Sequence, residues 1–314
     1  MKTLFIGSTR RGHLALEALL RAGLPVCGVL SLAQDAHESE RFEERIRGLA
    51  AAHRVPLREV RALKDPGLPA WVRETGAEAG FAVGARTLMP AGLFGAFPRG
   101  CWAAHDSLLP RYRGFAPLNW AVINGEKETG VSLFRVEEGV DTGDILLQRK
   151  VAIGPDESAP QVYERVCQVT AELVVEGHRL LREDRAVPVP QDHAQATYGC
   201  SRTPADGWID WGQPSEAIHN LIRGLTFPYP GAFTLHEGRR LFVLRSERLP
   251  QPPRYVGRIP GRVVKVGPDG SVEVLTGDGV LRLLEVSDDG STPQPAATLV
   301  RSVRARLGAP APTV

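Results

Sequence analysis

The 314-residue sequence predicts an α/β fold, in which a Rossmann-like domain on a parallel sheet is followed by a smaller domain of antiparallel strands. The first observation is a strand–helix–strand pattern, because the apolar runs TLFIGS (3–8) and PVCGVLSL (25–32) flank the helical spacing of GHLALEALLRAG (12–23). Such a unit pairs its strands in parallel. The second observation is that the hydrophobic pattern changes after residue 207, where apolar and polar residues alternate around glycine-containing turns.

The remaining elements of the first domain follow from hydrophobic periodicity. Strands are expected at 79–84 and 99–105, and as a pair at 129–136 and 143–153. Helices are expected at 39–54, 115–125 and 158–183, the last being the longest helical pattern in the chain.

A stretch rich in proline and polar residues follows the longest helix. Residues 184–207 have no strong period, which is typical of a linker. We therefore divide the chain into a first domain (1–185), a linker (186–206) and a C-terminal β-barrel domain (207–308).

Composition limits the class of protein. The hydrophobic content of 43% and charged content of 24% are ordinary for a globular protein. The net charge of +2 argues against a chain that coats nucleic acid, although a local basic patch is compatible with it. The four cysteines lack metal-ligand spacing, so we expect neither a disulfide framework nor a metal site. No signal peptide or membrane-spanning run is recognisable, which predicts a cytoplasmic location with no membrane partner.

The turn GSTRRG (7–12) between the first strand and helix raises the question of a nucleotide site. Its glycines are five apart with two arginines between them, so it is not G-x-G-x-x-G, and no Walker motif is present. A glycine such as Gly7 more often serves a tight strand-to-helix turn. We therefore disfavour dinucleotide binding.

His105 and Asp141 are the candidate catalytic pair. His105 ends an expected parallel strand, which is where α/β sheets place ligands, and Pro110 and Gly114 stiffen and turn the loop behind it. Asp141 follows in a glycine-bracketed loop between two strands. A lone histidine is more often a core residue and acids in such loops usually form turns, so spacing alone leaves the pair a hypothesis.

The stretch HDSLLPRYRGFAPLNWAVINGEKETGVSLFRVEEGVDTGDIL (105–146) resembles the formyltransferases that use formyltetrahydrofolate. The match runs without a gap, and a weaker match follows residue 200. The resemblance implies an OB-like barrel as the second domain and formyltetrahydrofolate as the formyl donor. The family that the chain resembles includes both methionyl-tRNA formyltransferases and amino-sugar formyltransferases.

The resemblance also implies a mechanism. A primary amine attacks the formyl carbon, and a negative charge develops on the formyl oxygen. His105 either donates a hydrogen bond to this oxygen or relays the proton that the amine loses. Asp141 would orient His105 and raise its pKa.

Ala103 departs from the family pattern, which has an asparagine two residues before the histidine to hold the formyl oxygen. Alanine has no side-chain donor, and loss of one such donor typically costs about 10²–10³ in rate. Two explanations stay open: an Asn→Ala change made to trap ligands, which we favour because the rest of the motif is intact, and a naturally divergent, slow member.

Further site residues are carried over from the resemblance. The expected formyl-folate contacts are Arg86, Leu88, Met89, Pro90, Ser107, Leu108, Leu109, Pro110, Val136, Gly139 and Asp144. The expected contacts to the amine substrate are Tyr112, Arg113 and Arg202, and the aromatics that could stack on a base are Trp208, Trp211, Phe227 and Tyr229.

The acceptor is inferred from charge. The stretch 34–62 carries six acids and six arginines, whereas tRNA-specific enzymes have a basic insertion there, which favours a nucleotide-linked amino sugar or another small or carrier-bound amine. Against this, 239–265 has eight basic residues and one acid and could contact RNA. The alternatives are methionyl-tRNA formyltransferase, a non-catalytic folate or nucleotide binder, and a formyl-folate hydrolase. The sequence does not predict the oligomeric state.

Overall fold

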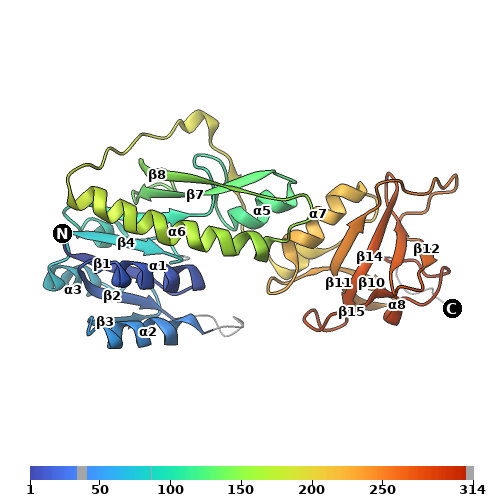
Figure 1. Ribbon diagram of the computed structural model, residues 1–314, viewed down its shortest axis with the longest axis horizontal. Coiled ribbons are helices and arrows are strands. Elements are labelled where there is room, and N and C mark those ends of the chain that lie inside the picture. The colour runs from blue at the N-terminus through green and yellow to red at the C-terminus, as the bar shows by residue number, and fades with distance from the viewer. Residues whose placement is uncertain (34–40, 86, 309–314) are drawn as a thin grey trace. The chain divides into compact units, whose positions relative to one another are not determined.

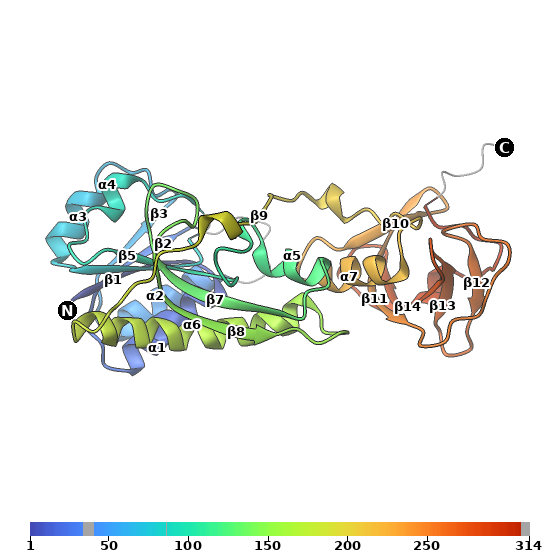
Figure 2. The same cartoon turned by 90° about the horizontal axis from the view of Figure 1, so that it is seen from above.

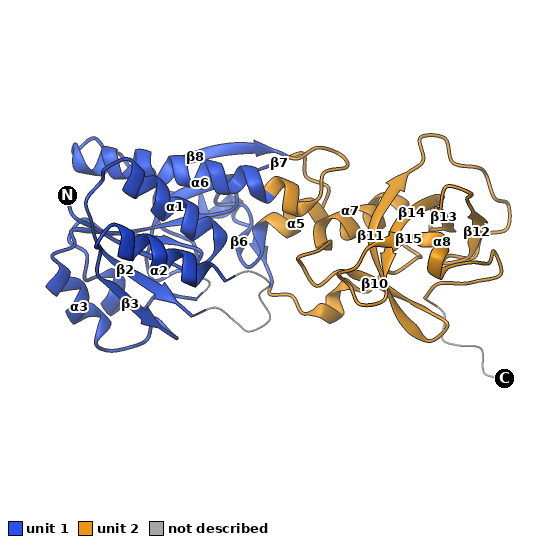
Figure 3. Cartoon of the chain, turned by 60° about the horizontal axis from the view of Figure 1, so that its bottom comes forward, with its two compact units in different colours: residues 1–117, 129–152, 163–200 blue, residues 118–128, 153–162, 201–314 orange. Residues whose placement is uncertain are grey.

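The computed structural model describes residues 1–33, 41–85 and 87–308, and the chain divides into two compact units (Figure 3). Unit 1 comprises Met1–Pro117, Thr129–Ala152 and Tyr163–Cys200. Unit 2 comprises Leu118–Glu128, Ile153–Val162 and Ser201–Val314. The chain therefore enters unit 2 twice before its last third begins, and the functional division at 185 and 207 stays a prediction.

A seven-stranded sheet forms the centre of unit 1, in the order β3-β2-β1-β4-β5-β7-β8 (Figure 1). Its strands are β1 (Thr3–Gly7), β2 (Val26–Leu32), β3 (Leu57–Val60), β4 (Ala79–Val83), β5 (Cys101–His105), β7 (Glu128–Arg135) and β8 (Ile145–Ala152). The first five strands pair in parallel, and β7 runs antiparallel to β5. The predicted Rossmann-like sheet is confirmed, although the short strand β3 was not predicted.

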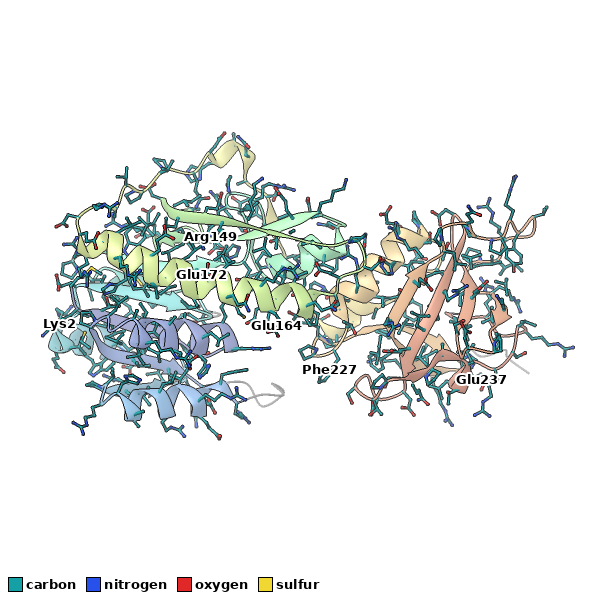
Figure 4. The ribbon with its side chains drawn as sticks, in the orientation of Figure 1. Lys2, Arg149, Glu164, Glu172, Phe227 and Glu237 are labelled. Atoms are coloured by element: carbon teal, nitrogen blue, oxygen red, sulfur yellow. The ribbon has the colours of Figure 1, made fainter. Side chains whose placement is uncertain are left out.

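Helices cover both faces of this sheet. They are α1 (Arg10–Arg21), α2 (Phe42–Ala52), α3 (Leu68–Thr75), α4 (Ala91–Phe94) and α6 (Ala159–Arg182). Figure 2 shows α1 and α6 on one face and α3 and α4 on the other. Gly177 lets α6 lie close to β7, because a methyl group there would meet Leu133 Cδ2 at 2.4 Å. Arg149 of β8 pairs with Glu172 and Glu176 of α6. Figure 4 labels Arg149 and Glu172 of this cluster.

The turn between β1 and α1 is shaped by close packing. A Cβ atom on Gly7 would lie 2.4 Å from the Val83 carbonyl oxygen, and one on Gly12 would lie 2.8 Å from the same atom. Thr9 caps α1 by accepting from the Gly12 N–H at 3.4 Å. The close approach of the end of β1 and the start of α1 to the Val83 carbonyl of β4 thus accounts for both glycines of the turn.

The segment that follows α6 is attached to unit 1. Val189 pairs with Ile145 through two backbone hydrogen bonds of 2.8 and 2.9 Å. The short strands β6 (Arg113–Gly114) and β9 (Tyr198–Gly199) pair in parallel, and a 3-10 turn (His193–Gln195) lies between these two attachments. Backbone pairing of this kind has no hydrophobic period, so the sequence could not reveal it.

Unit 2 contains a six-stranded antiparallel sheet, with the path β10-β11-β14-β13-β12 and β15 paired to β14. Its elements are α5 (Pro117–Ile123), a 3-10 turn (Pro204–Gly207), α7 (Ser215–Leu225), β10 (Ala232–His236), β11 (Arg239–Arg248), β12 (Val263–Val266), β13 (Val272–Leu275), β14 (Val280–Ser287), β15 (Gln294–Pro295) and α8 (Ala296–Leu299). Buried residues of α7 and the sheet form one apolar cluster. The predicted second domain of antiparallel strands is confirmed.

Trp211 belongs to that apolar cluster, which corrects the expectation that it could stack on a base. Its side chain is 4% exposed, and its indole N–H donates to Thr234 Oγ1 at 3.0 Å. Trp208 and Phe227, by contrast, are exposed. Across the described residues, no helix has the length and apolar character needed to cross a membrane.

Candidate functional site

His105 is the last residue of β5, and its imidazole lies within unit 1. The ring is 9% exposed and meets Phe134 of β7 edge-on, with centroids 6.5 Å apart. Nε2 lies 2.8 Å from the backbone carbonyl oxygen of Tyr112. A carbonyl only accepts hydrogen bonds, so Nε2 carries the proton of the neutral ring and Nδ1 keeps its lone pair.

Asp141 faces this free nitrogen. Its Oδ2 atom lies 3.6 Å from His105 Nδ1 and accepts a hydrogen bond from the Gly114 N–H at 2.8 Å. Asp141 has φ of +52°, a left-handed conformation that costs a non-glycine residue about 1 kcal/mol or more. The structure thus brings the two predicted catalytic residues together and holds one of them in a strained backbone conformation.

Burial controls the protonation of His105. Loss of hydration lowers the pKa of His105 below its ordinary value, and the Arg11 cation adds to this. The Asp141 carboxylate and the Tyr112 carbonyl act in the opposite direction but do not outweigh burial. Asp141 therefore raises the pKa of His105 as expected, but the sequence did not predict the larger effect of burial, and the net shift is downward.

A hydrogen-bond network fixes the loop after His105. Ser132 Oγ of β7 donates to the Ser107 carbonyl at 2.7 Å and accepts from the Leu109 N–H at 3.1 Å. Gln148 Nε2 of β8 donates to the Leu109 carbonyl at 3.0 Å and to Ser132 Oγ at 2.8 Å. Ser107 Oγ donates to the Arg111 carbonyl at 2.6 Å. The loop that carries the Tyr112 carbonyl is therefore held by two strands.

An ion pair connects this loop to α1. Arg11 of α1 pairs with Asp106, the residue that follows His105, and the two side chains are only 11% and 14% exposed. Charges with so little water around them depend on each other. The pair thus joins the first turn of α1 to the residue beside His105.

Ala103 lies two residues before His105 in β5, opposite Phe134 of β7. It is half-buried and packs, with Met89 and Val136, against the rim of the apolar cluster on one side of the sheet. A methyl group offers no hydrogen bond, so position 103 presents an apolar surface where the family motif has an amide.

The other expected folate residues are spread over three loops. Leu88 is 70% exposed, Pro90 precedes α4, and Arg86 lies outside the described residues. Leu108 and Pro110 are half-buried, whereas Ser107 and Leu109 are buried. Gly139 and Asp144 belong to the loop that carries Asp141, where a Cβ on Gly139 would meet Thr142 Oγ1 at 2.2 Å and the Asp144 carbonyl accepts from the Arg135 N–H at 2.9 Å.

The three residues expected to contact the amine have different environments. Tyr112 is half-buried with φ of +58°. Arg113 is only 1% exposed, and its guanidinium donates to Gln191 Oε1. This corrects the expectation for Arg113, because a side chain enclosed by its own domain cannot reach an incoming amine. Arg202 belongs to unit 2, where its guanidinium lies 5.3 Å from the Trp120 ring.

Sequence reasoning missed Ser132, Gln148 and Gln191. Ser132 is a buried polar residue within an apolar strand, which is a signal that can be read from TGVSLFRV. Gln191 lies in the stretch interpreted as a linker, where no pattern distinguishes it from its polar neighbours. Within the described ranges, no three His, Cys, Asp or Glu side chains gather in a way that could hold a metal ion.

Two family models match the chain. A model described as "Formyl transferase" matches residues 1–177, and a model described as "Formyl transferase, C-terminal domain" matches residues 202–304. The first contains both His105 and Asp141.

Full-length relatives share more than a third of their residues with this chain. The methionyl-tRNA formyltransferase of Heliobacterium modesticaldum is 38% identical over 319 residues, which cover 97% of this chain and 98% of the relative. The methionyl-tRNA formyltransferase of Anaeromyxobacter dehalogenans is 36% identical over 98% of this chain and 100% of the relative.

Solved structures share the fold at lower identity. The N-formyltransferase of Helicobacter canadensis, in complex with folinic acid and dTDP-3-aminofucose, has a TM-score of 0.68 at 16% identity and covers 90% of this chain and 98% of that one. HypX of Aquifex aeolicus, in complex with tetrahydrofolic acid, has a TM-score of 0.63 at 17% identity and covers 96% of this chain and 47% of that one.

These relatives correct one expectation. The neutral stretch 34–62 favoured a nucleotide-linked amino sugar as the acceptor, but the relatives at 34–38% identity over nearly the whole chain are named for methionyl-tRNA. A neutral stretch at one insertion does not exclude tRNA, because phosphate contacts can be supplied by any basic surface, such as the stretch 239–265. Part of that stretch, 34–40, lies outside the described residues, and the rest forms α2 and β3.

Proposed function

This chain belongs to the formyl transferase family and is a formyl-folate-dependent N-formyltransferase, and we propose that its acceptor is the amino group of methionyl-tRNA. The observation that carries the proposal is the 36–38% identity, over nearly the whole chain, to enzymes named methionyl-tRNA formyltransferase. A second observation supports it: 239–265 is strongly basic, and Arg239, Arg245 and Arg258 are exposed. Exposed arginines are suited to RNA phosphates.

His105 acts as the base in this proposal. Its Nε2 proton is engaged by the Tyr112 carbonyl, so Nδ1 is the atom that accepts a proton from the attacking amine. Its lowered pKa keeps the ring neutral, and therefore able to accept a proton, at neutral pH. Of the two roles implied by the resemblance, the geometry thus favours proton relay over donation to the formyl oxygen.

Asp141 stabilises the imidazolium that forms. Its carboxylate lies 3.6 Å from Nδ1, on the side where the new N–H appears. The Gly114 N–H holds the same carboxylate oxygen in place. The pair is thus arranged so that charge appearing on His105 meets a fixed opposite charge.

We expect the formyl donor to pack on the half-buried apolar residues Met89, Ala103 and Val136, which all border one apolar cluster of unit 1. A planar ring system needs such a surface to pack on, and the backbone of the loop with Gly139 and Asp144 offers polar groups beside it. When bound, the folate supplies the formyl carbon and takes up a proton on the nitrogen that leaves. Position 103 adds no donor for the formyl oxygen, so we expect slow turnover.

The test measures tetrahydrofolate release with methionyl-tRNA, with a panel of other amines, and without acceptor. Formylation of methionyl-tRNA, with binding that weakens by about 10³-fold or more between about 50 and 200 mM salt, supports the proposal. Formate release that is independent of acceptor would instead identify a formyl-folate hydrolase. Folate binding without turnover, even after Ala103→Asn, would identify a non-catalytic binder. A tRNA acceptor also supports the predicted cytoplasmic location, because charged tRNA is used where translation occurs.

A further inference from the structure

We propose that Gln191, held by Arg113, is a positioning residue that sets the loop of Asp141 and thereby the alignment of Asp141 with His105. The inference rests on the proposed roles of His105 and Asp141. It gives a function to two buried side chains that the reaction itself does not use.

The Gln191 amide bridges two parts of unit 1. Its Nε2 donates to the Asp141 carbonyl at 2.9 Å and to the Gly143 carbonyl at 2.7 Å. Its Oε1 accepts from Arg113 Nε at 3.2 Å and from Nη2 at 2.6 Å. An amide has two N–H groups and two oxygen lone pairs, and all four are used here. The side chain is only 6% exposed, so water does not compete for these bonds.

Its partners leave the amide one orientation. The guanidinium of Arg113 only donates, and the two loop carbonyls only accept. A flipped amide would place donor against donor and acceptor against acceptor. The Arg113 charge also strengthens the bonds that Gln191 makes to the loop, because a cation at the oxygen polarises the N–H groups.

The segment that carries Gln191 also holds the guanidinium of Arg113 in place. Nη2 lies 3.0 Å from His193 Nδ1, and Nη1 lies 3.4 Å from Tyr198 Oη. A buried guanidinium is costly unless its donors are satisfied, so this environment holds it in one position. The segment 189–199 therefore supplies Gln191 as well as the groups that anchor its partner Arg113.

The strand β6 and the segment 189–199 together hold both the backbone and the side chain of Asp141. Gln191 holds its backbone carbonyl, while the Gly114 N–H, next to Arg113 in β6, holds its carboxylate. Asp141 has φ of +52°, a conformation that persists only where surrounding bonds impose it. Release of the backbone would let Asp141 relax and move its carboxylate away from His105.

Two variants separate positioning from simple stabilisation. Gln191→Met keeps the length but makes no hydrogen bonds, and Gln191→Glu keeps the bonds from Arg113 but turns acceptors toward the loop carbonyls. Gln195→Met is the control, because Gln195 lies in the same segment but is exposed, and its Nε2 donates to Asp192 Oδ2 at 2.7 Å rather than to the loop of Asp141. Unfolding midpoints are measured for all three.

The first readout is the titration of His105 by NMR, assigned with His105→Gln. The charged groups that face His105 are Asp141 and Arg11, the latter paired with Asp106. Of these charged groups only Asp141 raises the pKa of His105, so a displaced Asp141 shifts the His105 midpoint to lower pH in Gln191→Met and not in Gln195→Met. Gln191→Glu adds a carboxylate of its own, so it is compared through the kinetics alone. This readout needs no acceptor, so it remains informative if methionyl-tRNA is not the substrate.

The second readout is steady-state kinetics with methionyl-tRNA. Both Gln191 variants should lower kcat by up to about 100-fold, as small misplacements of catalytic groups do, and leave KM for both substrates unchanged. An unmoved His105 midpoint, with kcat falling only in proportion to the unfolded fraction, would overturn the proposal and leave Gln191 a structural anchor. If the parent enzyme forms no product while the midpoint shifts, the proposed acceptor fails and the positioning role stands.

Discussion

The carbonyl oxygen of Tyr112 lies 2.8 Å from Nε2 of His105, and this bond decides which ring nitrogen is free. The backbone of Tyr112 is held in a left-handed conformation, with φ of +58°, and the Thr197 hydroxyl accepts from its N–H at 2.8 Å. The tautomer of His105, the proposed base, is thus set by the main chain of the following loop.

The first prediction concerns pH. Burial lowers the pKa of His105, and the free base is the active form, so kcat/KM should rise with pH through an inflection below 6.5 and stay level at neutral pH. Asp141→Asn removes the charge that raises this pKa, so the inflection should move to still lower pH and the plateau should fall. Glu138→Gln, an exposed change in the same loop, is the control. An inflection above 6.5 would contradict the assignment of His105 as a buried base.

The second prediction concerns Ala103. Ala103→Asn restores a side-chain donor and should raise kcat by about 10²–10³, measured as tetrahydrofolate release with acceptor present. Ala103→Leu has a similar size without a donor and should not raise it. Equal rates for the asparagine and leucine variants would show that another group already holds the formyl oxygen.

The third prediction concerns the ion pair between Arg11 and Asp106. Its side chains are 11% and 14% exposed, so Arg11→Met should destabilise the protein by roughly 3 kcal/mol, because Asp106 is left without its cation. The double variant with Asp106→Leu should recover most of that loss. Urea unfolding of the single and double variants measures the coupling, and additive losses would show that the two charges do not depend on each other.

The fourth prediction concerns the core of unit 2. Trp211→Ala should cost about 3–5 kcal/mol of unfolding free energy, because a 4% exposed indole is replaced by a cavity. Trp208→Ala, at a 40% exposed position, should cost clearly less. Trp211→Phe should leave acceptor affinity unchanged in a filter-binding assay. A selective loss of affinity in that variant would return Trp211 to the candidate binding residues.

The positions of most strands of unit 1 and the candidate pair of His105 and Asp141 could be anticipated, because periodicity and a motif are local signals. Periodicity marks β1, β4 and α6, and the motif after His105 marks the family. The environment of a side chain depends on what packs on it from elsewhere. Arg113 sits in a motif that suggests an exposed turn, yet residues nearly eighty positions later enclose it. The direction of the pKa shift of His105 also depends on distant residues. Burial lowers this pKa by more than the Asp141 carboxylate, which is visible in the sequence, raises it.

The division of the chain into interleaved units has a consequence for its synthesis. Asn119 donates to the Gly224 carbonyl, and the Glu157 carbonyl accepts from Arg223, so two early segments find their partners only in α7. A ribosome delivers these segments about one hundred and about seventy residues ahead of those partners. The side chain of Ile123 therefore stays exposed to solvent until the apolar cluster of unit 2 has been synthesised. In a polypeptide that ends at residue 200 it would stay exposed. Premature termination near the boundary between the units should yield an aggregating fragment rather than a working half-enzyme.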